Sequence, residues 1–213
     1  MKTDELVTLL AKSAGPVAPH ATTKRFATAL GCGVFVTIVA MLFMLGVRND
    51  ISEMMQLPMF WLKFLFPASV AAIALYAAMR LARPGMKPAY AHVLLGVLLA
   101  LLWFLGGTAL LGAAPGERSE LIFGDTWLFC IVIIPLLAIP VFAAAMWAMK
   151  GLAPTRLRLA GSTAGLLAGA TSAAVYALQC PELGAPFIAI WYVLGMFIPA
   201  FIGGLIGPRL LRW

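Results

Sequence analysis

Charged residues are scarce in this chain, and almost none falls inside its long apolar stretches. Only 11% of the 213 residues are charged, whereas 63% are hydrophobic. A soluble domain is about half apolar and about a quarter charged, so this composition excludes an ordinary soluble domain. An apolar stretch of about 20 residues is long enough to cross the hydrocarbon core of a membrane as a helix. We therefore expect an integral membrane protein.

The lack of ionisable residues within these stretches also restricts the function. Ion and proton transporters, and enzymes that hydrolyse bonds inside the bilayer, usually depend on buried acidic, basic or histidine side chains. Here such residues lie at the ends of the stretches, in short connections and in an N-terminal tail. A small multispan transporter or channel subunit is therefore only an alternative, because no polar substrate site lies at mid-span.

Six apolar segments predict an all-helical fold. The segments are too long for strands and show no alternation with a period of two. Charged residues, Gly or Pro bound each segment, as is usual at helix ends. The predicted fold is a bundle of six transmembrane helices over residues 26–213, preceded by a polar tail over residues 1–25. The expected spans are about 26–47, 61–82, 90–113, 126–149, 158–178 and 186–208.

Lysine and arginine predict the orientation of these spans. Twelve of the fifteen basic residues fall in the tail, in two alternate connections and at the C-terminus. The opposite connections hold only Arg48, Lys63 and Arg118. Because positively charged connections stay in the cytoplasm, we expect both termini to be cytoplasmic. The net charge of +7 is then a sign of topology, and we expect no direct contact with nucleic acid.

Small residues recur at every fourth position of the segment 158–178, at Gly161, Gly165 and Gly169. Such a row lets another helix approach closely in a membrane, where van der Waals contact replaces the missing hydrophobic driving force. Glycines in the segment 186–208 repeat this pattern. The row predicts packing between these two segments, and a homodimer face is the alternative.

The three cysteines contain no CxxC motif, which excludes a thioredoxin-like centre and disfavours a membrane thiol oxidoreductase. Cys32 lies early in the first span, and we interpret it as a packing residue. Cys130 and Cys180 both fall near the periplasmic ends of their spans, in a compartment that permits a disulfide. They are either two unrelated buried thiols or a redox- or metal-responsive pair. Two sulfurs make an incomplete metal site, even with Glu182 or Asp125 as a third ligand.

The tail contains a short stretch with helical periodicity. Leu6, Leu9 and Leu10 fall on one face, while Asp4 and Glu5 would lie favourably at the positive end of a helix. A helix of about ten residues is marginal in water unless its apolar face packs against something. A helix that lies on a membrane surface should carry Lys or Arg along its polar face, and this one carries few. The pattern therefore favours a protein partner over a membrane anchor.

Several short motifs, taken in their order along the chain, resemble those of a known protein family. The chain opens with MKTDEL at residues 1–6, followed by the short leucine helix and a proline-containing spacer. Near its end, Cys180-Pro181-Glu182 precedes Ala185-Pro186-Phe187 and Trp191-Tyr192. In this order, and with six spans, the motifs resemble the negative-regulator-of-sigma-F (NrsF) family of bacterial integral-membrane anti-sigma factors. The resemblance covers essentially the whole chain.

This resemblance implies a regulator that acts without catalysis or cofactor. The tail would help to hold an extracytoplasmic-function (ECF) sigma factor at the bacterial inner membrane, away from RNA polymerase. The periplasmic-side cysteines of the family, which Cys130 and Cys180 match, would take part in sensing oxidative or heavy-metal stress. Whether the signal is a disulfide, a metal or another modification stays open. The expected partner-binding residues are Asp4, Glu5, Leu6, Leu9 and Leu10.

Overall fold

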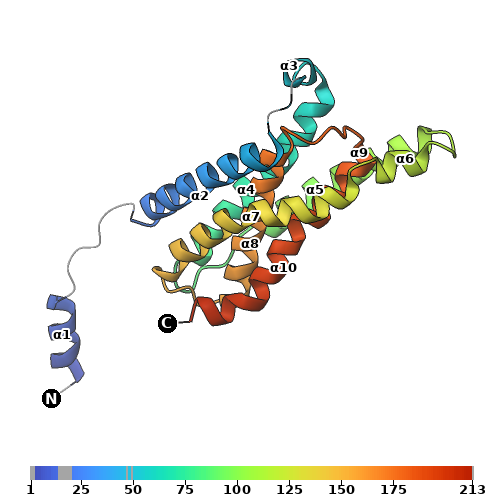
Figure 1. The fold of residues 1–213 in the computed structure, drawn as a ribbon. Helices are drawn as coiled ribbons and strands as arrows, with labels where there is room; N and C mark the ends of the chain where they lie inside the picture. The colour runs from blue at the N-terminus through green and yellow to red at the C-terminus, as the bar shows by residue number, and fades with distance from the viewer. Residues whose placement is uncertain (1–2, 14–20, 47, 49, 213) are drawn as a thin grey trace.

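The computed structural model describes residues 3–13, 21–46, 48 and 50–212 of the chain. Within these residues the regular structure is entirely helical and includes no strand, which confirms the predicted all-helical fold. One small helix, α1, lies apart from a bundle of longer helices (Figure 1). The elements are α1 (Thr3–Ser13), α2 (Ala21–Leu45), α3 (Ile51–Met54), α4 (Pro58–Leu81), α5 (Ala91–Gly112), α6 (Arg118–Phe123), α7 (Trp127–Lys150), α8 (Leu157–Tyr176), α9 (Ala185–Phe187), the π-turn η1 (Ile188–Tyr192) and α10 (Val193–Leu210).

A helix lies in each of the six segments whose hydropathy predicted one. Five of these are long and apolar enough to cross a membrane, namely α2, α4, α5, α7 with the preceding α6, and the continuous run from α9 to α10. These five helices indicate association with a membrane. The helix α8 does not belong to this group, because Gly, Ser and Thr occupy much of its length and lower its hydropathy.

The helix α8 lies at the centre of the bundle. It packs against α10, α4 and α7, and most of its residues are buried. The fully buried Ser172 donates a hydrogen bond from Oγ to the carbonyl oxygen of Ile134 in α7, at 2.8 Å. A helix surrounded by other helices depends on close approach more than on strongly apolar side chains. Its position therefore explains why α8 is the least apolar of the six long segments.

The glycine row of α8 forms its contact with α10. A Cβ atom at Gly161 would overlap the carbonyl group of Gly203, and one at Gly165 would overlap that of Pro199. The expected packing between these two segments is therefore confirmed. The face at Gly161, Gly165 and Gly169, for which a homodimer was the alternative, is filled by α10 of the same chain.

Replacing Gly165 by alanine is expected to destabilise the bundle. The new methyl group has to push α8 and α10 apart, and overpacking of this kind costs about 1–3 kcal/mol. The melting temperature of the full chain in detergent measures the loss. The matched control is Gly96→Ala, because nothing lies within 4 Å of a Cβ atom at that helical position. Equal melting temperatures for the two variants would contradict the close contact.

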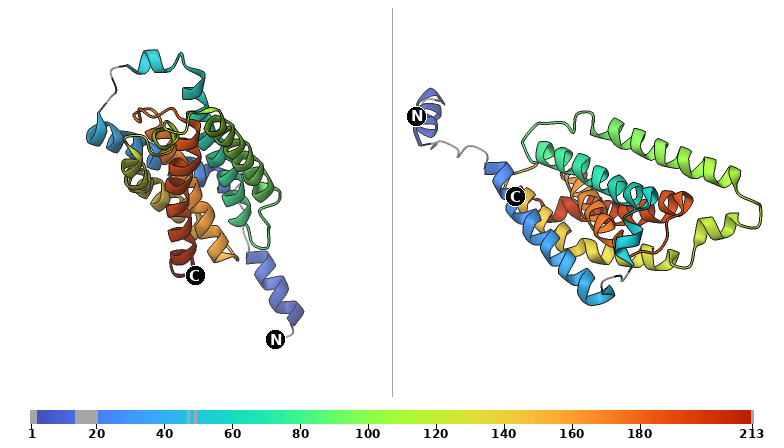
Figure 2. Two further views of the ribbon diagram at one scale, coloured as in Figure 1. Left: turned by 90° about the vertical axis from the view of Figure 1, so that its right-hand side faces the viewer. Right: turned by 90° about the horizontal axis from the view of Figure 1, so that it is seen from above.

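The other long helices surround α8 less closely. The helix α2 packs along α7, where the buried Thr37 donates from Oγ1 to the carbonyl oxygen of Leu137 at 3.0 Å. At Gly33 a Cβ atom would lie 3.1 Å from the Cα atom of Val141, so these two helices also approach closely. The helix α5 packs against α4 and α9 at the edge of the bundle (Figure 2). It is the least buried of the five membrane candidates.

The connections after α2, α6 and α8 gather at one end of the bundle. Gln179 donates from Nε2 to the carbonyl oxygen of Leu45, the last residue of α2, at 3.0 Å. Trp191 donates from Nε1 to the carbonyl oxygen of Ile122 in α6 at 2.7 Å. We call this the cysteine end, because the connection after α8 contains Cys180.

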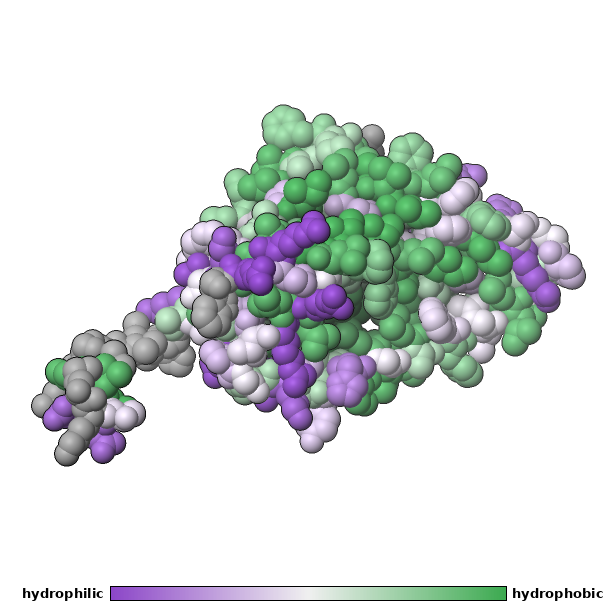
Figure 3. Space-filling view, turned by 90° about the horizontal axis from the view of Figure 1, so that it is seen from below, coloured by the Kyte–Doolittle hydropathy of each residue, from purple (hydrophilic) through white to green (hydrophobic). Residues whose placement is uncertain are grey.

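The opposite end, which we call the termini end, holds the start of α2 and the end of α10. The guanidinium group of Arg25 lies 4.4 Å from the ring centroid of Trp147 in α7 and donates to its carbonyl oxygen at 3.1 Å. Near the end of α10, a Cβ atom at Gly207 would lie 2.6 Å from the carbonyl oxygen of Leu157. The surface of the bundle in Figure 3 is largely hydrophobic, with hydrophilic residues gathered towards the part from which α1 extends.

Candidate functional site

Cys130 and Cys180 meet at the cysteine end of the bundle. Cys130 lies in the first turn of α7, and Cys180 follows α8, with its backbone N–H donating to the carbonyl oxygen of Tyr176 at 3.0 Å. Both cysteines are buried, and their thiols interact with each other. Cys32, which we interpreted as a packing residue, is instead exposed on α2. The structure thus brings together the two cysteines that the sequence analysis selected.

Lys63 is a buried cation beside this pair. It is fully buried in α4, and its Nζ donates to the carbonyl oxygens of Cys180 and Glu182, each at 2.6 Å. The same atom lies 5.5 Å from the ring centroid of Tyr192. The expectation that Lys63 belongs to an outer connection is therefore wrong. The connection after α8 folds over the start of α4 and supplies the acceptors that this buried amine needs.

Two tyrosines complete what we call the cysteine cluster: Lys63, Cys130, Tyr176, Cys180 and Tyr192. Tyr176 Oη lies 3.9 Å from Cys130 Sγ, and the two tyrosine rings are 6.1 Å apart. Tyr192 is fully buried, and its hydroxyl makes no hydrogen bond of ordinary geometry with any described residue. It ends η1, a π-turn of the kind that often occurs at functional sites.

The surroundings of Cys180 favour the charged form of its thiol. The hydrogen bond with the Cys130 thiol and the positive charge of Lys63 lower the pKa of the Cys180 thiol, although burial acts in the opposite direction. Arg48, which is paired with Asp50, also interacts electrostatically with Cys180. Because the thiolate is both the nucleophile and the metal ligand, these contacts favour the form of Cys180 that reacts.

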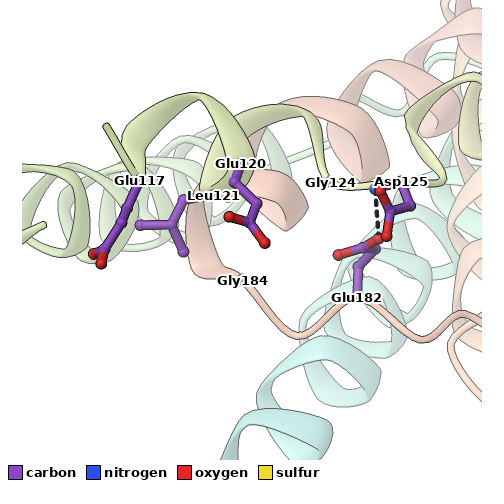
Figure 4. Close-up of a pocket in the computed structure, with 7 residues that line it drawn as sticks. All are labelled: Glu117, Glu120, Leu121, Gly124, Asp125, Glu182 and Gly184. Carbon is purple, nitrogen blue, oxygen red and sulfur yellow. Dashed lines mark hydrogen bonds between the residues drawn. The ribbon is translucent and has the colours of Figure 1, made fainter. Parts of the chain in front are cut away.

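The carboxylate of Glu182 ties the Cys180 connection to α7. Its Oε1 accepts hydrogen bonds from the backbone N–H of Asp125 at 2.9 Å and from the hydroxyl of Thr126 at 3.4 Å. Gly124 lies against the same carboxylate with a φ of +51°, so a side chain there would be both strained and obstructed. A cavity of about 360 Å³ opens beside this contact (Figure 4) and is lined by Glu117, Glu120, Leu121, Gly124, Asp125, Glu182 and Gly184.

The acidic cavity has no arrangement that would hold a metal ion. Within the residues that the structure describes, no three His, Cys, Asp or Glu side chains lie close enough together to do so. Glu182 was a possible third ligand for the two sulfurs, but its carboxylate is bonded to Asp125 and Thr126 instead. Glu117 stands well apart from Glu182 in the cavity (Figure 4). The cysteines therefore face each other without a third protein ligand among these groups.

The predicted partner-binding residues lie on α1, apart from the cysteine cluster. Asp4, Glu5, Leu6 and Leu9 are exposed, with exposed fractions of 42% for Leu6 and 59% for Leu9. The side chain of Leu10 lies outside the described part of the chain. Two exposed leucines on one face of a short helix leave an apolar surface that a partner can cover.

Sequence reasoning missed three members of the cysteine cluster. Lys63 had a detectable signal, because it stands inside an otherwise apolar run from Trp61 to Pro67. An ionisable residue inside a membrane segment is a functional candidate by default. Tyr176 and Tyr192 gave no such signal, because aromatic residues near helix ends are common as interfacial anchors.

Comparison with known proteins shows which family this chain is related to. A family model described as "Negative regulator of sigma F" (NrsF) matches residues 10–213. The chain belongs to the NrsF family. The match covers all of the helices from α2 to α10, and with them the whole cysteine cluster. The resemblance inferred from the short motifs is therefore confirmed.

Two NrsF relatives align with the chain over their full length. The probable anti-sigma-F factor NrsF of Azospira oryzae is 50% identical over 213 residues, which is 100% of both chains. The anti-sigma-F factor NrsF of Caulobacter vibrioides is 34% identical over 220 residues, again 100% of both chains. No solved structure matches the chain. Because the NrsF family is one of regulators, the expectation that the chain is not an enzyme is confirmed.

Proposed function

We propose that this chain is an anti-sigma factor of the bacterial inner membrane that senses stress through its cysteines. It sequesters an ECF sigma factor at the cytoplasmic face and releases it when oxidative or heavy-metal stress modifies Cys130 or Cys180. The observation that carries the proposal is that these two cysteines meet in a buried cluster at one end of the bundle. The helix α1, which carries the exposed Leu6 and Leu9, lies towards the other end (Figure 1). Membership of the NrsF family supports the anti-sigma role.

With six membrane crossings, both termini lie on the same side of the membrane, and the cysteine end lies on the other side. The helix α8 begins at the termini end, where Leu157 lies against Gly207, and finishes at the cysteine end, where Tyr176 contacts Cys130. It thus runs between the same two ends as α7 and α10, which supports α8 as the sixth crossing despite its lower hydropathy. The distribution of basic residues then supports cytoplasmic positions for both termini. The cysteine cluster lies on the periplasmic side in this orientation.

The helix α1 supplies the surface for the sigma factor. A helix of eleven residues is marginal in isolation, so it gains stability when its leucine face packs into a groove of a partner. Asp4 and Glu5 in its first turn add negative charge beside that face. The tail residues selected from the sequence, Asp4, Glu5, Leu6, Leu9 and Leu10, are the proposed contacts.

The helix α2 connects the two functional ends. At the cysteine end its last carbonyl group accepts a hydrogen bond from Gln179, the neighbour of Cys180 in the chain. At the termini end Arg25 fixes its first turns to Trp147 of α7. A change at Cys180 therefore reaches the helix that follows the tail. Allosteric couplings are typically about 1–3 kcal/mol, whereas complete release needs roughly 5.5 kcal/mol, so a coupling of ordinary size releases only part of the bound sigma factor.

Removing residues 2–20 is expected to abolish capture of the sigma factor by the membrane protein. This deletion takes away α1 but keeps α2 and its Arg25 contact, so the bundle itself should persist. Co-purification with the candidate ECF sigma factor from the same genome measures the binding. An unchanged melting temperature of the truncated chain in detergent is the control for folding. Equal capture by the full and truncated chains would overturn the tail as the binding surface.

A further inference from the structure

Lys63 is a buried cation without an acidic partner. Two of the three donors on its Nζ go to the carbonyl oxygens of Cys180 and Glu182. In the part of the chain that the structure describes, no carboxylate forms an ion pair with it. A buried charge is costly unless an opposite charge or a full set of hydrogen bonds compensates it. The side chain of Cys180 is the remaining group that hydrogen-bonds with this amine.

Other donors converge on the sulfur of Cys180. The Cys130 thiol hydrogen-bonds with the Tyr176 hydroxyl at 3.9 Å, and both groups interact with this sulfur. The Tyr192 hydroxyl faces it from η1 and is buried without a hydrogen bond of ordinary geometry among the described residues. A neutral thiol is a weak acceptor and gains little from several polar neighbours, whereas a negatively charged sulfur is stabilised by them. The cluster therefore has the donor pattern of a thiolate site.

We propose that Lys63 is the positioning residue of the sensor, and that it holds Cys180 as the thiolate that reacts first with a peroxide. Cys130 is then the resolving cysteine. This inference rests on the proposed function, because it gives the two cysteines of the sensor different roles. Lys63 acts through Cys180 and through the two carbonyl groups that flank it, and it takes no direct part in bond formation.

The two steps balance without any other reactant. The Cys180 thiolate attacks one oxygen of hydrogen peroxide, so that an S–O bond forms and the O–O bond breaks. The leaving hydroxide takes up a proton and becomes water, while the sulfur is oxidised by two electrons to a sulfenic acid. The sulfur of Cys130 then attacks Cys180, forming the S–S bond and breaking the S–O bond. The thiol proton leaves with the hydroxide as a second water.

Oxidation removes the charge that compensates Lys63. The disulfide sulfur of Cys180 is neutral, so the buried ammonium loses its nearest negative group while it still holds the carbonyl groups of Cys180 and Glu182. This loss destabilises the connection after α8. Gln179, which belongs to the same connection, contacts the last residue of α2. Loss of this negative charge is thus the electrostatic step that couples oxidation of Cys180 to movement of the connection after α8.

The reactivity of Cys180 towards iodoacetamide as a function of pH tests this role. The titratable and charged groups that face Cys180 are Lys63 from α4, Cys130 from α7, Tyr176 from α8, Tyr192 from η1 and Arg48 from the connection after α2. A thiol with a lowered pKa keeps its reactivity in mildly acidic solution, because the thiolate is the reacting form. Removing Lys63 raises that pKa, so the profile must move towards alkaline pH.

The experiment uses the full chain in detergent with the background substitution Cys32→Ser, and mass spectrometry follows alkylation at Cys180. With Lys63→Met we expect the profile to be displaced by about one pH unit, so that the rate at pH values below the midpoint falls about tenfold. Lys63→Arg keeps the charge and should restore most of the reactivity below the midpoint. A merely structural role of Lys63 would change accessibility at every pH and leave the midpoint in place. An unmoved midpoint in Lys63→Met would overturn the proposal.

A second variant keeps the test decisive if Lys63→Met does not fold. Tyr192→Phe keeps the buried ring but removes one donor from the sulfur, so we expect a smaller displacement of the midpoint in the same direction. An unmoved midpoint in this variant would count against the thiolate site. Capture of the sigma factor by the same preparations, before and after peroxide, separates the two claims. A displaced midpoint with no release by peroxide would leave the thiolate site intact and overturn the proposed sensing function.

Discussion

Cells that carry Cys180→Ser are expected to lose all further induction of the sigma-dependent genes by peroxide, and to show raised transcription already without peroxide. Serine is close to cysteine in size, but its hydroxyl forms neither a sulfenic acid nor a disulfide. Because this hydroxyl is neutral, it also leaves the amine of Lys63 without the compensating charge. A reporter gene under control of the sigma factor measures the ratio of transcription with and without peroxide. Cys130→Ser should lose induction as well, because the disulfide cannot form without its second sulfur.

The control for this experiment is Cys32→Ser. Cys32 is exposed on α2, whereas Cys130 and Cys180 are buried together at the cysteine end. The proposal requires that the Cys32 variant respond to peroxide like the parent chain. Induction that survives in Cys180→Ser, or that disappears in Cys32→Ser, would contradict the assignment of sensing to the buried pair.

Introducing two aspartates on the leucine face of α1 is expected to release the sigma factor without any stress. In Leu6→Asp with Leu9→Asp, two exposed apolar side chains become charged, and a partner groove would have to bury these charges. Full burial of each leucine is worth about 1.5–3 kcal/mol, so the double variant should bind roughly 100-fold more weakly or worse. The dissociation constant of the purified pair in detergent measures the effect.

Thr8→Asp is the matched control for the leucine face. Thr8 is exposed on the opposite side of α1, where its hydroxyl donates to the carbonyl oxygen of Asp4 at 2.7 Å. The substitution adds negative charge to the same helix without touching the apolar face. Binding should therefore change little. If Thr8→Asp weakened binding as much as the double variant did, net charge rather than the leucine face would govern the interaction.

The fold was largely predictable from the sequence because membrane insertion is governed by local hydropathy. Long apolar runs marked the positions of α2, α4, α5, α7 and α10 without any knowledge of their contacts. The helix α8 shows where this reasoning weakens. Its small and polar residues serve a central position between neighbouring helices, which is a property of the assembled bundle.

The glycine row of α8 shows what a local pattern contains and what it omits. The spacing of Gly161, Gly165 and Gly169 predicted a close helix contact, and the structure has one. The partner of that contact depends on the path of the chain, so the same row was compatible with α10 or with a second copy. A repeated small residue therefore marks an interface but does not name the other side of it.

The cysteine cluster was only half predictable for a related reason. The depth of Cys130 and Cys180 followed from the predicted spans, so their common location at one end of the bundle was expected. The hydrogen bond from Lys63 to Cys180 instead joins two positions far apart in the chain and on different elements. Because Lys63 lies near the start of an apolar segment, the sequence analysis assigned it to a connection between spans. Hydropathy does not show that the connection after α8 folds over Lys63.

The π-turn η1 also determines how the outermost long helix is attached. Lipid contacts satisfy an apolar helix as well as protein contacts do, so α5 has little hydrophobic reason to join its neighbours. Trp103 of α5 donates from Nε1 to the carbonyl oxygen of Ala189 in η1 at 3.1 Å, and Gly106 lets the two backbones approach. Three residues after Ala189, the same turn ends at Tyr192 in the cysteine cluster. The turn η1 therefore both holds α5 against the bundle and supplies Tyr192 to the cysteine cluster. A rearrangement of this turn moves both α5 and Tyr192.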